Sequence, residues 1–136
     1  MSAIIIAKKL VETRLNTITP SLPIAWAAVA FTTPTDGSKY LRCNLTIGKP
    51  DDRCKGSTYY RENATFNVYV MDKLNIGTVS ALETAESIRS LFPKGFSIEE
   101  GGTRVNVLKT PHIAGAVVTL DRLVCPITLS LTIESF

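Results

Sequence analysis

The sequence is poor in the residues that enzymes and metal proteins use for chemistry. Its 136 residues include one histidine, His112, and three cysteines, none of which forms a CxxC pair. A zinc site needs several Cys or His ligands at suitable spacing. The Walker, GxGxxG and G-x-S-x-G motifs are also absent. This scarcity favours a structural or interaction protein that is not an enzyme and needs no cofactor or metal.

A strong charge imbalance and long apolar runs are missing too. The net charge of +3 permits contact with nucleic acid but does not indicate it, because dedicated binders cluster basic residues on one face. No apolar run reaches the roughly 20 residues of a membrane-spanning helix. The first lysines follow a short apolar run, which is the wrong order for a secretory signal. The odd cysteine count then predicts a reduced, cytoplasmic setting without membrane contact.

What the sequence does contain is typical of one globular domain over residues 1–136. Hydrophobic residues make up 45% of the chain and charged residues 20%, which is an ordinary balance. A chain of this length can bury a core large enough to fold without disulfides or metals.

The stretch from Thr58 to Phe96 predicts a long strand, a turn and one amphipathic helix. From Ala64 the residues alternate between apolar and polar, as in a strand with one buried face. Turn formers follow at Asp72–Gly77, and the period then becomes helical. Thr78 is the expected N-cap, and the predicted apolar stripe consists of Val79, Leu82, Ala85, Ile88 and Phe92.

The remaining patterns add a second helix and several strands. Helical spacing predicts a core helix at 2–18, part of whose broad apolar face could meet another subunit. Strands are expected at Ile24–Phe31, Tyr40–Ile47, Phe96–Ile98, Thr103–Val107 and Leu123–Ile133, with a turn at Glu99–Gly102 and an unassigned segment at Thr110–Val118.

The sum predicts an α+β fold. Two helices would pack on one face of a mainly antiparallel mixed sheet. In the last strand, Pro126 cannot donate to a neighbouring strand, which favours an edge position or a bulge there.

An extended β-hairpin should project from this sheet. Residues 48–56 are polar and rich in turn formers, and they join two predicted strands. Such a tip is either a solvated loop or an arm that docks on a partner. Its candidate docking residues are Lys49, Asp51, Asp52, Arg53 and Lys55.

Other groups of residues are weaker candidates for a binding or catalytic site. Tyr59, Tyr60 and Arg61 mix aromatic and basic groups, as a single-strand nucleic-acid binder does. His112 could serve an enzyme only with partners at a subunit junction. Cys43 and Cys125 lie on apolar strand faces and are expected to act as small core residues.

Several segments, taken in order, resemble the tail-terminator proteins of lambda-like long-tailed bacteriophages. The resemblance covers most of the chain from Ile24 onward, and its order and spacing carry it more than any single motif. Ala28, Ala30 and the turn at residues 72–77 depart from the family pattern. The matching segments are Ile24–Trp26, Phe31–Pro34, Tyr40–Arg42, Phe66–Val70, the helix Gly77–Leu91 closed by Phe92–Gly95, Pro111–Ile113 and the terminal strand.

The resemblance implies a virion protein at the head–tail junction, assembled in the host cytoplasm. Such proteins form a homohexameric ring on the tail tube protein, end tube polymerisation and offer a surface to a head-completion or connector protein. Genomic DNA would pass through the ring without sequence recognition, and no catalysis is required. The alternative is a small nucleic-acid-binding or protein-binding module without catalysis.

Overall fold

A computed structural model describes residues 3–18, 22–26, 29–33, 38–51, 60–75, 77–119 and 122–136. Two helices and eight strands occur within these ranges. Their bounds are α1 Ala3–Leu15, β1 Ile24–Ala25, β2 Tyr40–Asp51, β3 Tyr60–Asp72, α2 Val79–Leu91, β4 Ser97–Glu100, β5 Thr103–Val107, β6 His112–Ile113, β7 Val117–Val118 and β8 Leu123–Ser135.

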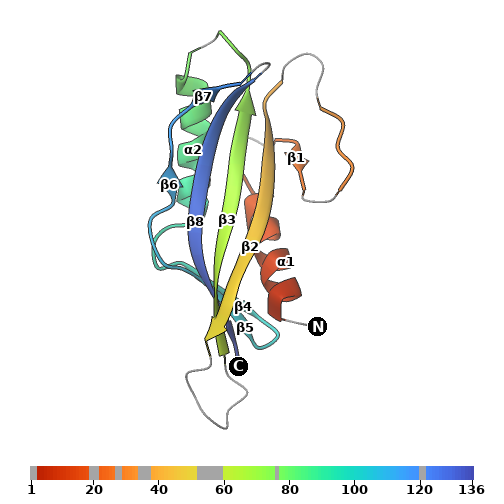
Figure 1. The fold of residues 1–136 in the computed structure, drawn as a ribbon, viewed down its shortest axis with the longest axis vertical. Coiled ribbons are helices and arrows are strands. Elements are labelled where there is room, and N and C mark those ends of the chain that lie inside the picture. The colour runs from red at the N-terminus through yellow and green to blue at the C-terminus, as the bar shows by residue number, and fades with distance from the viewer. Residues whose placement is uncertain are drawn as a thin grey trace.

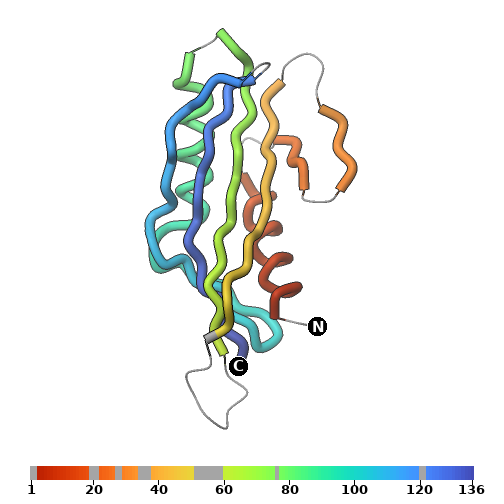
Figure 2. Tube along the Cα trace, viewed as in Figure 1, coloured from red at the N-terminus to blue at the C-terminus, as the bar shows by residue number. Residues whose placement is uncertain are grey.

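The strands form one sheet, in the order β1-β2-β3-β8-β5-β4 (Figure 1). β2, β3 and β8 are its long members and run side by side along the molecule (Figure 2). On the side away from β3, β8 pairs in turn with β7, β6 and β5. Every pairing is antiparallel except that of β1 with β2, so the expected mixed, mainly antiparallel sheet is confirmed.

Both helices cover the same face of the sheet. α1 packs on β5, β8 and β4, and α2 packs on β3 and β8. The alternation in the long strands places their apolar residues on this face, as the sequence predicts. Phe66 of β3 is 1% exposed, and its ring lies 6.3 Å from that of Phe92, just after α2. The core beneath the helices includes Leu41, Cys43, Ala64, Val68, Val70, Cys125, Ile127, Leu129, Leu131 and Ile133.

Pro126 shows why a proline can occur in a central strand. β8 has neighbours on both sides, so it is not an edge strand of the sheet, but at Pro126 it has no paired strand on the side away from β3. The N–H of Ala114 donates to the Pro126 carbonyl at 3.0 Å, so the backbone of Pro126 faces away from β3. On that side β6 has ended and β7 has not begun. The missing N–H of Pro126 therefore faces the interruption between two short strands.

The buried stripe of α2 differs from the predicted one at its start. Ala81, Thr84, Ala85 and Ile88 are buried, whereas Val79 is 66% exposed and Leu82 is 36% exposed. Both stripes have helical spacing, so the spacing alone could not distinguish them. The small residues at 81 and 84 allow the helix to pack closely on the sheet. Thr78 is the N-cap, but its side chain makes no capping hydrogen bond.

Three further expectations need correction. The strand predicted over Ile24–Phe31 covers only Ile24–Ala25 among the described residues. Glu99 and Glu100 belong to β4, so the turn is confined to Gly101 and Gly102, both at positive φ. The alternation of the predicted strand Tyr40–Ile47 places Tyr40 with Arg42 and Asn44 on the outward, polar face, but Tyr40 is 3% exposed because Phe31 and Arg122 cover its ring. Within the described residues, neither helix is long and apolar enough to cross a membrane.

Candidate assembly surfaces

The β2–β3 hairpin forms the predicted arm. β2 extends four residues beyond the predicted end at Ile47 and pairs with β3 down to Asp51 and Arg61. The register shifts between Ile47 and Pro50, which marks a bulge at the base of the arm. The extended hairpin of the predicted fold is therefore present. A bulge bends the strand that carries it, so the end of the hairpin is bent relative to the rest of the sheet.

The candidate docking residues of the arm are only partly described. Lys49 is exposed at the bulge, next to the close approach of Gly48 to β3. A Cβ at Gly48 would lie 2.8 Å from the Asn63 carbonyl oxygen, so this crossing requires glycine. Asp51 ends β2, and Asp52, Arg53 and Lys55 lie outside the described residues. The docking role of the arm stays a prediction.

A buried carboxylate lies at the base of the same arm. Glu62 of β3 is 6% exposed and points toward the helix-covered face, opposite Pro50 and Ile133. Its Oε2 atom has no hydrogen-bond partner among the described residues. A buried carboxylate costs free energy unless it is paired. We therefore expect substitutions around Glu62 to alter the stability of this end of the hairpin.

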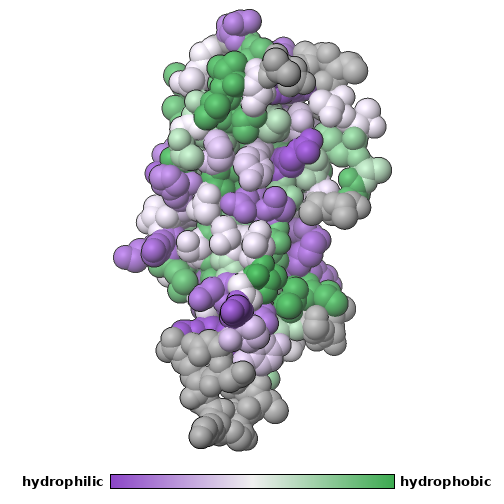
Figure 3. All heavy atoms as spheres, in the orientation of Figure 1, coloured by the Kyte–Doolittle hydropathy of each residue, from purple (hydrophilic) through white to green (hydrophobic). Residues whose placement is uncertain are grey.

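The face of the sheet opposite the helices is open and mostly uncharged. Asn67 donates to the Asn44 side-chain oxygen at 3.1 Å across β3 and β2. In Figure 3 this face carries hydrophilic and intermediate residues over its middle, with hydrophobic atoms toward its upper end and lower right. The register places on this face the uncharged polar residues Asn44, Thr46, Asn63, Thr65, Asn67, Asn106, Thr128, Ser130 and Thr132.

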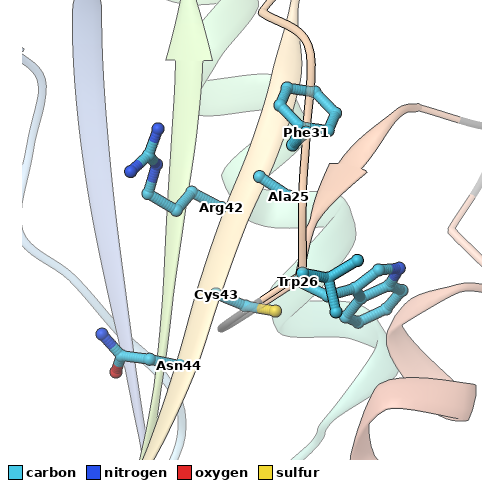
Figure 4. Close-up of a pocket in the computed structure, with 7 residues that line it drawn as sticks. Ala25, Trp26, Phe31, Arg42, Cys43 and Asn44 are labelled. Atoms are coloured by element: carbon cyan, nitrogen blue, oxygen red, sulfur yellow. The ribbon is translucent and has the colours of Figure 1, made fainter.

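A notch of about 400 Å³ lies where β1 leaves the edge of β2. Trp26 and Phe31 form its aromatic walls, and β2 supplies Arg42, Cys43 and Asn44 (Figure 4). The thiol of Cys43 points toward Trp26, whereas Arg42 and Asn44 point to the other face of the sheet (Figure 4). The notch therefore spans the edge of the sheet and is an opening in the surface, without a cluster of converging polar groups.

A second hollow, of about 460 Å³, lies on the open face near the upper ends of the long strands. Arg122 is 5% exposed at its margin, donates to the Ser38 carbonyl at 2.7 Å, and lies 5.0 Å above the Tyr40 ring. These contacts hold the guanidinium in place as part of the structure. Arg42, Tyr69, Met71 and Val124 complete the lining with Thr33.

Within the described part of the chain, the residues suited to chemistry are not brought together. His112 is exposed in β6, opposite Thr128. Cys43 and Cys125 are buried, as predicted, and burial raises the pKa of both thiols, that of Cys43 to about 12. A thiol in that state is a poor nucleophile. Among the described residues, no group of three or more His, Cys, Asp or Glu side chains could hold a metal ion.

The aromatic–basic cluster is divided by the strand. Tyr60 packs against the core, and Arg61, the next residue of β3, points to the opposite face. Tyr59 lies outside the described residues. Successive bases could not stack on Tyr60 while Arg61 held their phosphates on the same face.

The fold and its surfaces define a small α+β protein whose distinctive features are an arm, an open sheet face and one notched edge. The family model for phage tail terminator proteins matches residues 7–131, and the chain belongs to this family. It is therefore a structural component of a phage tail.

One solved structure supports the fold over the whole length of the chain. It shares 26% sequence identity with this chain and superposes with a TM-score of 0.77. The match covers 100% of this chain and 98% of that one. No curated protein sequence matches the chain significantly.

Proposed function

We propose that the protein closes the phage tail tube as a homohexameric ring, ends tube polymerisation and offers the surface to which the head is joined. The match to the tail-terminator family over residues 7–131 carries this proposal. The surfaces described above agree with it, because the chain offers edges and faces suited to contact other proteins. The site of action is the head–tail junction of the virion, after assembly in the host cytoplasm.

A ring requires each copy to contact two neighbours through two different surfaces. Such a heterologous contact closes only if its rotation completes a circle. The central channel must let genomic DNA pass without sequence recognition. The open sheet face suits this task, because its middle carries amides and hydroxyls, and its charged residues of both signs, Arg42, Arg61, Arg104, Glu99 and Glu134, nearly balance.

The arm supplies the contact with neighbouring virion proteins. Lys49, Asp51, Asp52, Arg53 and Lys55 place both charge signs close together at its end. Mixed charges of this kind orient a partner more than they raise affinity. The partners are the tail tube protein on one side and a head-completion or connector protein on the other. No catalysis and no cofactor take part.

The test is a phage that lacks the protein. Electron microscopy of lysates should show tails of irregular, extended length and heads without attached tails. The purified protein added back to tail tubes should bind the tube end with the mass of a six-membered ring. Tails of fixed length joined to heads in the deletion phage would overturn the proposal.

A nucleic-acid-binding or other small binding module is the second candidate. It is less well supported, because its proposed residues Tyr60 and Arg61 lie on opposite faces of β3. Salt-dependent DNA binding by a stable monomer would favour it.

A further inference from the structure

One edge of the sheet is open along most of β2. β1 pairs with β2 only at Leu41 and Arg42, and no other described strand pairs with β2 on that side. The Leu41 N–H donates to the Pro23 carbonyl at 2.9 Å, so the backbone groups of Leu41 face this edge. By the alternation of antiparallel pairing with β3, the backbone groups of Leu45 and Ile47 face the same way.

Between the pairing with β1 and the bulge at residues 47–50, this open edge lacks the devices that protect edge strands from pairing. Natural edges carry charged residues or proline, or are covered by other segments. Residues 43–48 contain neither a charged residue nor a proline. An unprotected edge of this length is a template for an added strand, and the notch beside Trp26 leaves room at its upper end.

The opposite side of the sheet offers a second open edge. β6 and β7 pair with β8 on one side only, and they lie across the molecule from β2 (Figure 1). The N–H of Ala114 donates to β8, so the backbone groups of Ile113 point outward. A strand from the β6–β7 segment can therefore still form hydrogen bonds on its outer side.

The exposed apolar residues divide between the same two sides. On the β2 side of the molecule lie α1, whose Ile4 and Ile5 are 39% and 54% exposed, and Val29 beside the notch, at 59% (Figure 1). We call these three residues the β2 flank. The β6–β7 flank lies on the opposite side of the view in Figure 1. It consists of Val79 and Leu82 of α2, Leu108, whose N–H donates to the Ser130 carbonyl of β8, and Val117 and Val118 of β7. The remaining large exposed apolar residue of the described chain, Phe136, packs under Arg104 at 4.8 Å.

We propose that the β2 edge of one copy pairs with the β6–β7 edge of the next copy, so that the sheets of neighbouring copies join into one. The apolar flanks would cover each other on the helix side of this junction, except for Val117, which lies opposite Val124 on the open face. Two different surfaces meet, so the contact is heterologous and repeats around a ring. This inference rests on the proposed ring and names the surfaces that build it.

The test uses one charged substitution on each flank. Ile5→Glu and Val118→Glu change side chains that are 54% and 69% exposed, so both variants should fold like the unchanged protein, as circular dichroism would check. With tail tubes, each variant alone should fail to form the ring. Phe136→Glu, at 53% exposure but outside both flanks, is the matched control and should assemble normally.

Mixing the two variants distinguishes head-to-tail pairing from other arrangements. Ile5→Glu spoils one flank and Val118→Glu the other, so one of each can still join through their intact flanks. The expected species is a dimer of the two variants, and the ring should not form. If Ile5→Glu blocks assembly and Val118→Glu does not, the inference is replaced by a two-fold contact between β2 edges or by a different protein at that edge.

Hydrogen exchange tests the strand pairing itself. The amides of Leu45 and Ile47 should exchange at least about tenfold more slowly in the ring than in the free protein. Those of Asn44 and Thr46 face β3 and provide the internal reference. Unchanged exchange at Leu45 and Ile47, or rings formed by both flank variants, would overturn the inference and leave the ring proposal intact. Failure of the unchanged protein to form a ring would overturn both.

Discussion

Lys39 joins the start of α2 to the end of β3. Its Nζ atom donates to the side-chain oxygens of Ser80 and Thr84 at 2.7 and 2.8 Å and to the Ser80 carbonyl at 3.2 Å. It also lies 3.8 Å from Oδ2 of Asp72, whose side chain is 4% exposed. One lysine thus binds polar groups of α2 and balances the charge of a buried carboxylate, whose Oδ2 atom has no hydrogen-bond partner among the described residues.

Replacing this lysine should therefore be costly. We expect Lys39→Met to lower the free energy of unfolding by about 2–4 kcal/mol, because Asp72 would keep a buried charge without its partner. Urea denaturation measures the change. The double variant Lys39→Met with Asp72→Asn should recover part of the loss, since it removes the uncompensated charge. Equal stability of the single variant and the unchanged protein would contradict this account.

The thiol of Cys43 gives a pH-dependent prediction. Burial, followed by the nearby Glu12 carboxylate, raises its pKa to about 12 in the folded protein, and Lys8 opposes the shift. Above a pH of about 9 the unfolded thiol loses its proton while the folded one keeps it, so stability is lost as pH rises. We expect a fall of up to about 1.4 kcal/mol per pH unit between about pH 9 and 12.

Comparison with Cys43→Ala isolates this effect from other groups that titrate in alkali. Urea denaturation at pH 8 and pH 10 should show a smaller loss of stability for the variant than for the unchanged protein. Identical pH dependence of the two proteins would show that the thiol does not contribute. Burial of Cys43 and Cys125 was predictable, because each lies in an alternating apolar run.

At the level of elements, alternation predicted the strands that matter most. β2, β3 and β8 were identified because a period of two, kept over many residues, is typical of a strand with one buried face. The short strands β6 and β7 could not be predicted from Thr110–Val118, because they exist only through pairing with β8. Tyr40 was misplaced for a related reason, since the residues that cover it come from distant parts of the chain.

The corrected face of α2 leads to a prediction for the helix start. Val79 is 66% exposed in the first turn, which has no acidic residue. We expect Val79→Glu to raise the free energy of unfolding by about 0.3–1 kcal/mol, because a carboxylate there interacts favourably with the helix dipole. Ala81→Glu, at a position with 0% exposure, should instead destabilise strongly. Thermal denaturation compares the stability of the two variants. Similar melting temperatures for both would refute the assignment of the buried face of α2.

At the level of the whole molecule, the helix-covered sheet could be predicted but the surfaces could be predicted only in part. The charged composition of residues 48–56 indicated the arm, and pairing down to Asp51 and Arg61 gives it a base. The two open edges were not predicted. Which strand lies at an edge depends on the order of strands in the sheet, and local sequence does not encode that order.

The arm carries the last prediction. Deleting residues 53–55 should leave the helix-covered core and ring formation intact, because the described residues 48–50 at the base of the arm are not part of the core. If the arm docks on a virion partner, phage with this deletion should show tails of altered length or heads without tails by electron microscopy. Lys49→Glu, at the described base of the arm, should weaken partner binding about tenfold, and more so at low salt. Lys94→Glu, an exposed lysine after α2, is the matched control. Normal, uniform tails and full infectivity of the deletion phage would show that the arm is only a solvated loop.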